Sequence, residues 1–227
     1  MGDEPGTPFL AAVVDGENVN REMGTETQNG KVRPMEPKLD GKSTRVTEIL
    51  LAKIDEQIER LTHIIAQLPV GRLDWAPEIP TAVARPPRRL GSVLGHLLEC
   101  LAGFVAVLYA AHPEQLGHFQ ELKNRRVNRL CAEAEALERI AEYGRHIHEG
   151  FQLLDDRDLT RPLQTVFVPE GEPVLTLLLG NIEHLINHKH ELFLYGKMLG
   201  LPLATPDLYR FRGAAVADAQ GDPNSGA

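Results

Sequence analysis

The hydrophobic residues of this chain recur at helical spacing over four separate stretches. The first runs from about 44 to 68, and its apolar residues follow one another at steps of three and four. They are Val46, Leu50, Ile54, Ile58, Leu61, Ile65 and Leu68. This spacing places them along one side of a helix, which can be buried against a core. Ser43 or Thr44 is the expected N-cap of this helix.

Two further helices are predicted at about 91–111 and 121–154. The earlier one is apolar over much of its circumference, which is typical of a well-buried helix, and Gly91 or Ser92 is its expected N-cap. The later one has a narrower inward stripe, made of Leu130, Ala134, Leu137, Ala141, Gly144, Ile147 and Phe151. Residues 69–90 are rich in proline and form a long connection, in which Trp75 is expected to pack against one end of the helices.

The fourth helix is predicted at about 176–200. No proline interrupts it, and Gly200 followed by Pro202 is a typical helix stop. Four long amphipathic helices with two long connections predict an all-α fold, a four-helix bundle, over residues 43–212. The flanking segments 1–42 and 213–227 show no apolar periodicity, and we expect both to be disordered tails.

Candidate chemistry is concentrated on the fourth helix. His184 and His188 are four residues apart, so both imidazoles project from one face, and Glu191 and Tyr195 continue the same stripe. Two histidines at this spacing can bind one divalent metal. The spacing alone is common on polar helix surfaces, so the site needs a third ligand from elsewhere.

His96 falls within the most apolar helix. A buried imidazole requires a hydrogen-bond partner or a metal, and the residues alone leave both open. Glu99 and Cys100 follow on the same side of the helix. Cys100 and Cys131 are interpreted as core thiols. His148 lies nearer an apolar stripe and is a weaker site candidate, whereas the remaining histidines are expected on the surface: His63, His112, His118, His146 and His190.

Charge and composition limit the function classes. A net charge of −8 argues against a general nucleic-acid binder, since phosphate neutralisation requires a basic surface. The basic segments 85–89 and 123–126 lack interleaved aromatic residues and are interpreted as solvated charge. No uninterrupted apolar run approaches the length of a membrane span, and two separate cysteines form no disulfide framework. We therefore expect a cytoplasmic protein that binds no membrane.

Three segments resemble the DinB-like (YfiT-like) metalloenzyme family. They are LPVGRLDWAPEIP, LGSVLGHLLEC and EHLINHKHELFLYGKMLGLP, and their order and separation match over about residues 43–212. The resemblance implies a four-helix bundle in which three histidines bind one divalent ion. At the matching positions of this chain these are His96, His184 and His188. Dimerisation to a homodimer is also implied by the resemblance.

The resemblance further implies an enzyme, a metal-dependent S-transferase, isomerase or hydrolase that acts on a small electrophilic molecule. A low-molecular-weight thiol is the implied cosubstrate, and Glu191, Glu99 and Tyr195 are the candidates for proton transfer. A three-histidine site suits Zn²⁺ or Ni²⁺, which we favour, and also Fe²⁺ or Mn²⁺. A di-iron carboxylate site is excluded, because it requires Glu-x-x-His on two helices and this chain has none.

The alternative is a non-catalytic helical bundle with a structural or vestigial metal site, or a partner-binding module. Structural zinc sites have four protein ligands, and only three are credible in the sequence. This count favours catalysis.

Overall fold

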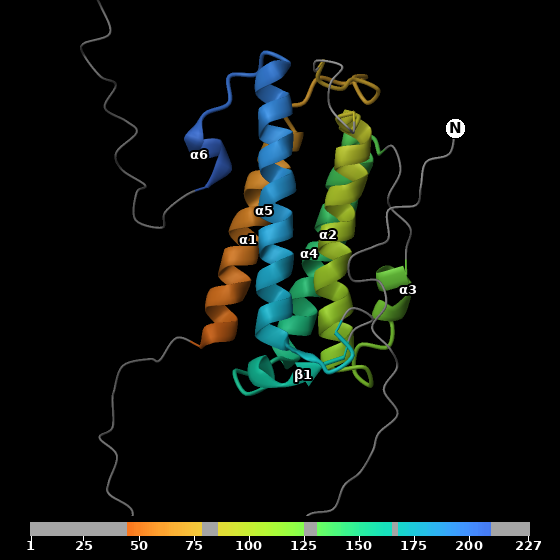
Figure 1. Cartoon of the computed structure of the whole chain (residues 1–227), viewed down its shortest axis with the longest axis vertical. Helices are drawn as coiled ribbons and strands as arrows, with labels where there is room; N and C mark the ends of the chain where they lie inside the picture. Colours follow the sequence, from red (N-terminus) through yellow and green to blue (C-terminus); the bar gives the residue numbers. More distant parts are fainter. Residues whose placement is uncertain (1–44, 79–85, 125–130, 165–167, 210–227) are drawn as a thin grey trace, which may run out of the picture.

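The computed structural model describes residues 45–78, 86–124, 131–164 and 168–209, which are mostly helical. Four long helices lie side by side (Figure 1): α1 (Val46–Ile65), α2 (Leu90–Ala111), α4 (Glu133–Leu153) and α5 (Val174–Met198). The shorter elements are α3 (Phe119–Asn124), a 3₁₀ turn (Asp158–Thr160), α6 (Thr205–Leu208), and strands β1 (Pro162–Leu163) and β2 (Glu172–Pro173), which pair antiparallel. The all-α expectation is confirmed for these residues. The predicted tails and the predicted domain limits at 43 and 212 lie outside them.

The long helices form a closed ring. α2 packs against α4 on one side and α5 on the other, and α1 completes the ring by packing on α4 and α5. α1 and α5 run in one direction while α2 and α4 run in the other (Figure 1). The connection between α2 and α4 therefore returns along the length of the molecule, and the backbone N–H of Cys131 donates to Gly91 O beside the start of α2.

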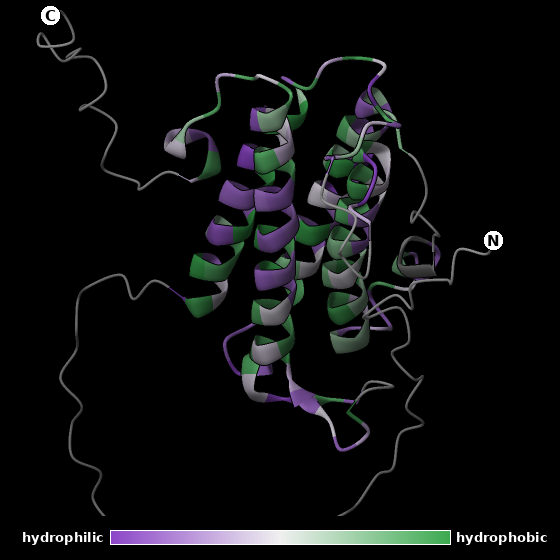
Figure 2. Cartoon of the chain, turned by 45° about the horizontal axis from the view of Figure 1, so that its top comes forward, coloured by the Kyte–Doolittle hydropathy of each residue, from purple (hydrophilic) through white to green (hydrophobic). Residues whose placement is uncertain are grey.

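The core lies inside this ring, and α2 contributes most to it. Hydrophobic residues run along every long helix, with hydrophilic ones interspersed (Figure 2). α2 is the helix of the described residues with the length and composition to cross a membrane, but 83% of its most apolar window is buried within the protein. Apolar core helices of soluble proteins share this composition, so the absence of a membrane span stays a prediction.

The stretch predicted as one helix over 121–154 is two helices, and that prediction is wrong. α3 reaches Asn124 and α4 begins at Glu133, and shortly before α4 the backbone N–H of Cys131 donates to Gly91 O. The inward stripe is also different over the first half of α4. Ala134 and Ala141 are exposed. The buried residues are Ala136, Ile140, Tyr143, Ile147, Gly150 and Phe151.

The start of α1 is capped from a distant part of the chain. The N-cap is Arg45, not Ser43 or Thr44, and its side chain makes no capping hydrogen bond. Instead the Asp156 carboxylate accepts from the backbone N–H of Val46 and of Thr47, each at 3.0 Å. These two donors hold the pKa of Asp156 below its ordinary value of 3.8, because they favour the ionised carboxylate. The N-cap of α2 is likewise Arg89, not Gly91 or Ser92.

A buried polar layer joins α1 to the C-terminal side of α5. Lys189 is 3% exposed, and its ammonium donates to Gln57 Oε1 and to the carbonyl of Leu208. Arg60 is 4% exposed and donates to Pro206 O at 3.3 Å. Backbone carbonyls at α6 thus serve as acceptors for two buried cations. We call Gln57, Arg60 and Lys189 the lysine layer.

A glycine allows α2 and α5 to approach closely. A Cβ at Gly103 would lie 2.8 Å from Oδ1 of Asn181, which is 1% exposed on α5. Gly103 is one and two helical turns beyond Cys100 and His96 on the same face of α2. The close approach therefore occurs beside the residues that the sequence singled out.

Candidate metal centre

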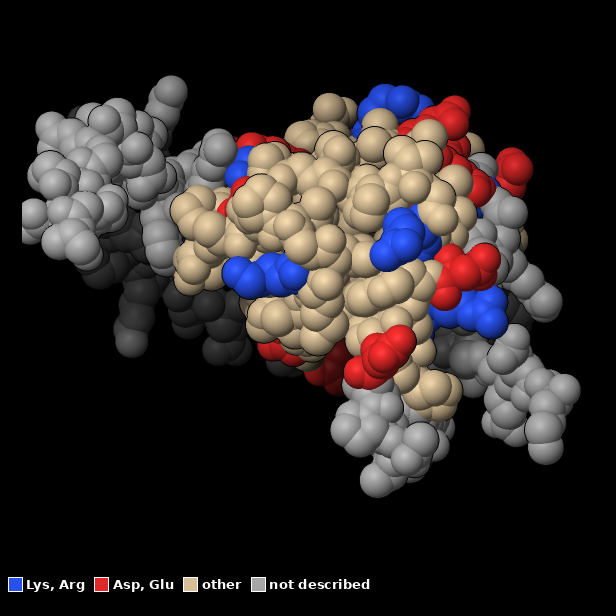
Figure 3. Space-filling view, turned by 90° about the horizontal axis from the view of Figure 1, so that it is seen from above, with Lys and Arg blue, Asp and Glu red and all other residues tan. Residues whose placement is uncertain are grey.

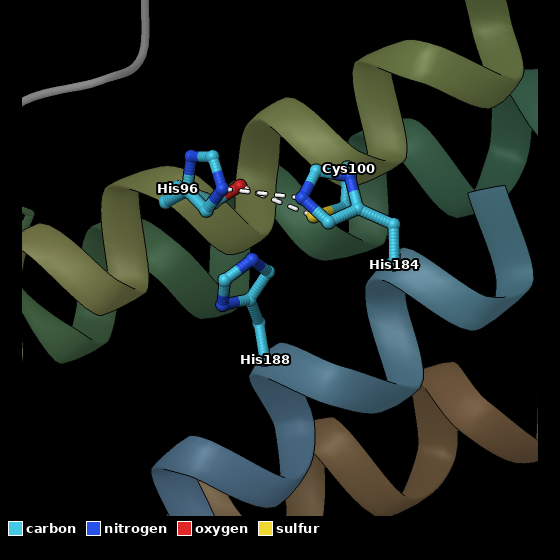
Figure 4. A group of neighbouring side chains, drawn as sticks. All are labelled: His96, Cys100, His184 and His188. Atoms are coloured by element: carbon cyan, nitrogen blue, oxygen red, sulfur yellow. Dashed lines mark hydrogen bonds between the residues drawn. The ribbon is translucent and has the colours of Figure 1, made fainter. Parts of the chain in front are cut away.

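The three histidines predicted as metal ligands come together between α2 and α5. Nε2 of His96 lies 3.2 Å from Nε2 of His184. The ring of His188 is 4.4 Å from that of His96 and 4.8 Å from that of His184, between centroids. Figure 4 shows the His96 ring from one helix facing the other two rings from the other helix. His184 and His188 share one face of α5 because they are four residues apart, and the packing of α2 on α5 brings His96 to that face.

Two of these imidazoles are oriented by a carboxylate on their own helix. Nδ1 of His96 donates to Glu99 Oε2 at 2.8 Å, and Nδ1 of His188 donates to Glu191 Oε2 at 2.8 Å. Both pairs have the spacing His-x-x-Glu. A proton held on Nδ1 leaves the lone pair on Nε2, the atom that would bind a metal. The arrangement fits an imidazole-bound divalent ion.

His184 is held in its neutral form by its surroundings. Burial, followed by the charges of His188 and His96, lowers the pKa of His184 to about 4. A neutral imidazole is the form that coordinates metals. Because Nε2 of His96 is an acceptor, we assign the proton between the two nitrogens to His184 Nε2 in the metal-free chain. An ion bound through Nε2 of His184 would require the other tautomer of this ring.

Cys100 is a fourth group within reach, which the predicted ligand set did not include. Its Sγ and one nitrogen of each of the three histidines all lie within 4.8 Å of one another (Figure 4). The thiol is 1% exposed and donates to His96 O at 3.4 Å. Burial, and next the Glu99 carboxylate, raise the pKa of Cys100 to about 12, so it is protonated in the metal-free chain. Coordination to a metal would require loss of this proton.

Glu191 and Tyr195 lie at the edge of the histidine cluster. Burial would raise the pKa of Glu191, but the His188 hydrogen bond and the positive charges of His188 and Arg88 lower it overall. The Tyr195 hydroxyl donates to Arg88 O at 3.0 Å and lies 3.4 Å from Glu191 Oε1. Burial and the Glu191 charge raise the pKa of Tyr195 to about 12. At neutral pH Glu191 is therefore a proton acceptor and Tyr195 a donor.

Arg88 is a residue of this region that the sequence analysis missed. It was interpreted as solvated loop charge, yet its Nη1 lies 3.9 Å from Glu191 Oε2 and 3.5 Å from His188 Nδ1. Seen end-on, the molecule shows basic and acidic side chains interspersed around a mostly uncharged surface (Figure 3). Trp75 packs edge-on against Tyr195, with ring centroids 5.4 Å apart. The connection between α1 and α2 thus supplies neighbours that periodicity could not reveal.

The remaining histidines lie outside the cluster. His148 is wrong as a site candidate, because it is exposed on α4 and pairs with Asp55 of α1 at 2.7 Å. His190 and His63 are exposed, as predicted. His112 is partly buried at the end of α2 rather than exposed, with Nε2 3.5 Å from Asp158.

Comparison with known proteins assigns no family to the chain. No protein-family model matches the sequence, and a search of the curated proteins gives no significant match. The resemblance to DinB-like proteins therefore rests on the three short segments described above.

Proposed function

We propose that this chain is a DinB-like four-helix bundle in which His96, His184 and His188 hold one divalent metal ion. The observation that carries the proposal is the convergence of three imidazoles, two of them with Nδ1 bound to Glu99 and Glu191. Polar contacts in a core do not require three imidazole rings to meet, whereas three imidazoles are a known ligand set for a divalent ion of the zinc or nickel class. Fe²⁺ and Mn²⁺ are the alternatives.

We further propose that the site is catalytic and acts on a small electrophilic molecule with a low-molecular-weight thiol as cosubstrate. An ion bound there would supply Lewis acidity, which favours thiolate or water as a nucleophile at neutral pH. Glu191 keeps the His188 ring oriented and accepts a proton, and Tyr195 keeps its own proton for donation. Arg88, whose side chain is 46% exposed, offers a positive charge beside the histidines to an anionic substrate group.

A structural metal site is the second candidate, and Cys100 is the observation that favours it. With Cys100 as a ligand the set would be three histidines and one thiolate, and structural zinc sites have four protein ligands. In the catalytic reading the thiol stays protonated and leaves a coordination position open to substrate.

Metal content of the untagged protein tests the site. We expect His184→Ala to hold one divalent ion fewer per chain than the wild type by mass spectrometry, with an unchanged circular dichroism spectrum. His190→Ala is the matched control, since it removes an exposed histidine from the same helix. Equal metal content in the wild type and His184→Ala would refute the proposed site.

Cobalt substitution separates the two candidates. A sulfur-to-cobalt charge-transfer band that is lost in Cys100→Ala would show a closed, four-ligand site. Its absence, together with spectral changes on adding a small thiol, would support an open catalytic site.

A further inference from the structure

A second group of metal-ligating side chains lies on the outer surface of α4, away from the histidine cluster. It consists of His118, directly before α3, and of His146 and Glu149 on α4. One ligand atom of each lies within 4.8 Å of the others. Nε2 of His118 is 3.0 Å from Glu149 Oε1. His146 and Glu149 are three residues apart, so they share one face of the helix.

The ring of His146 is already set in the orientation that a ligand needs. Its Nδ1 donates to the backbone carbonyl of Glu142 at 2.8 Å, which fixes the proton on Nδ1 and leaves the lone pair on Nε2. A surface ion pair between His118 and Glu149 would need no second histidine. The position of His146 is therefore the feature that a simple ion pair does not explain.

A buried aromatic residue packs against the imidazole rings of both His118 and His146. Phe119 is fully buried, and its ring makes edge-on contacts with His118 and His146, at centroid distances of 4.8 and 5.3 Å. Such contacts restrict the two imidazoles to a narrow range of orientations. The ligands come from two elements, so a bound ion would tie the segment before α3 to α4.

We propose that His118, His146 and Glu149 form a second divalent-metal site, which takes Zn²⁺ or a similar ion such as Ni²⁺ or Co²⁺. Two imidazoles and one carboxylate suit these ions better than Mg²⁺ or Ca²⁺, which prefer oxygen ligands. His118 and Glu149 are half exposed, with side-chain exposures of 50% and 46%. The ion therefore exchanges with solvent, and its remaining coordination positions are open to water or to an external ligand. This proposal does not depend on the function proposed above.

The test is equilibrium dialysis of untagged protein against Zn²⁺, in a His184→Ala background that disables the other site. We expect the His184→Ala protein to bind one ion per chain. The double variant, with His146→Ala as well, should bind none. Glu149→Gln in the same background should weaken Zn²⁺ binding about tenfold or more. Loss of a residue that only hydrogen-bonds to a metal ligand already has an effect of this size. His148→Ala is the matched control, because it removes an exposed, carboxylate-paired histidine from the same helix.

Thermal unfolding provides a second readout. Zn²⁺ should raise the melting temperature of the His184→Ala background and of its His148→Ala derivative, but not of its His146→Ala derivative. The proposal is overturned if the background binds no Zn²⁺, or if it binds Zn²⁺ equally well with and without His146. A different result is expected if only the histidine cluster fails to bind metal. The wild type and His184→Ala would then bind the same number of ions, and this binding would still depend on His146.

Discussion

Helix α5 carries two polar clusters of opposite character on adjacent residues. His188 belongs to the histidine cluster that faces α2, and Lys189 belongs to the lysine layer that faces α1. In the lysine layer the donors of a buried ammonium meet acceptors supplied by Gln57 and Leu208. In the histidine cluster three imidazole rings meet, and Nε2 of His96 faces Nε2 of His184. The Lys189 ammonium finds its acceptors within the chain itself, whereas the histidine cluster is suited to a cation from outside.

The lysine layer therefore serves the fold, whereas for the histidine cluster we propose a functional role. A buried charge costs free energy unless the protein supplies its partners, and the lysine layer supplies them. In the histidine cluster, Glu99 and Glu191 accept hydrogen bonds from Nδ1 of His96 and of His188, which leaves the lone pair of each ring on Nε2. Four predictions test the two clusters and the helix packing and capping around them, from the largest expected effect to the smallest.

Lys189→Ala should lower the free energy of unfolding by about 3 kcal/mol, because it leaves Gln57 and a backbone carbonyl unsatisfied and opens a cavity. Lys189→Met should have a smaller effect, since it keeps the volume of the side chain. Urea unfolding measures both. Neither variant should change metal content, and a loss of bound metal would show that the two clusters are coupled.

Saturation with metal should stabilise the protein through the histidine cluster and not through the lysine layer. At a free ion concentration of 100 times Kd, one site contributes about 2.7 kcal/mol to the free energy of unfolding. Chemical unfolding with and without Zn²⁺ should show a smaller gain in His184→Ala than in His190→Ala. Equal gains in the two variants would contradict the assignment.

Gly103→Val should cost about 2 kcal/mol through overpacking, because the new side chain meets Asn181. It should also weaken metal binding, since α2 and α5 would be pushed apart next to the ligands. Competition with a chromogenic chelator measures this affinity. Gly144→Val on α4 is the control, because a Cβ there has open space around it.

Asp156→Ala should have the smallest effect, and one that depends on pH. The folded pKa of Asp156 is lowered, so its contribution is complete above its ordinary pKa of 3.8 and is lost as the pH falls below that value. The melting temperature of the wild type should exceed that of the variant at neutral pH, and the gap should narrow in acid. A gap of constant size down to the lowest pH at which both proteins fold would count against capping by the ionised carboxylate.

Sequence periodicity predicted the long helices well, but not what fixes their ends. α2 and α5 match their predicted ranges to within two residues, because apolar spacing is a local property. The break before α4 depends on Cys131 meeting Gly91, a contact between distant segments. The N-caps were wrong for the same reason, since Asp156 replaces a local cap at α1.

The candidate site was predictable where its residues share a helix. His184 and His188 follow from their spacing, whereas His96 was assigned as the third ligand from the resemblance of its segment to the DinB-like family. Arg88 could not be recognised, because its place beside Glu191 depends on how a proline-rich connection folds back. Cys100 was interpreted as a core thiol, and it is buried, but only the packing of α2 on α5 shows that it also faces the histidines. Metal binding by these residues stays a prediction.

The distant cap of α1 has a consequence for the order in which the protein is made. Asp156 is 110 residues beyond Val46, and Pro206, which accepts from Arg60, is 146 residues beyond that arginine. A ribosome completes α1 long before it reaches either partner. Contacts over such separations form late, because the chain between them must first be ordered. Helix α1, the first of the described helices to be synthesised, is therefore expected to be the last to be secured at both ends.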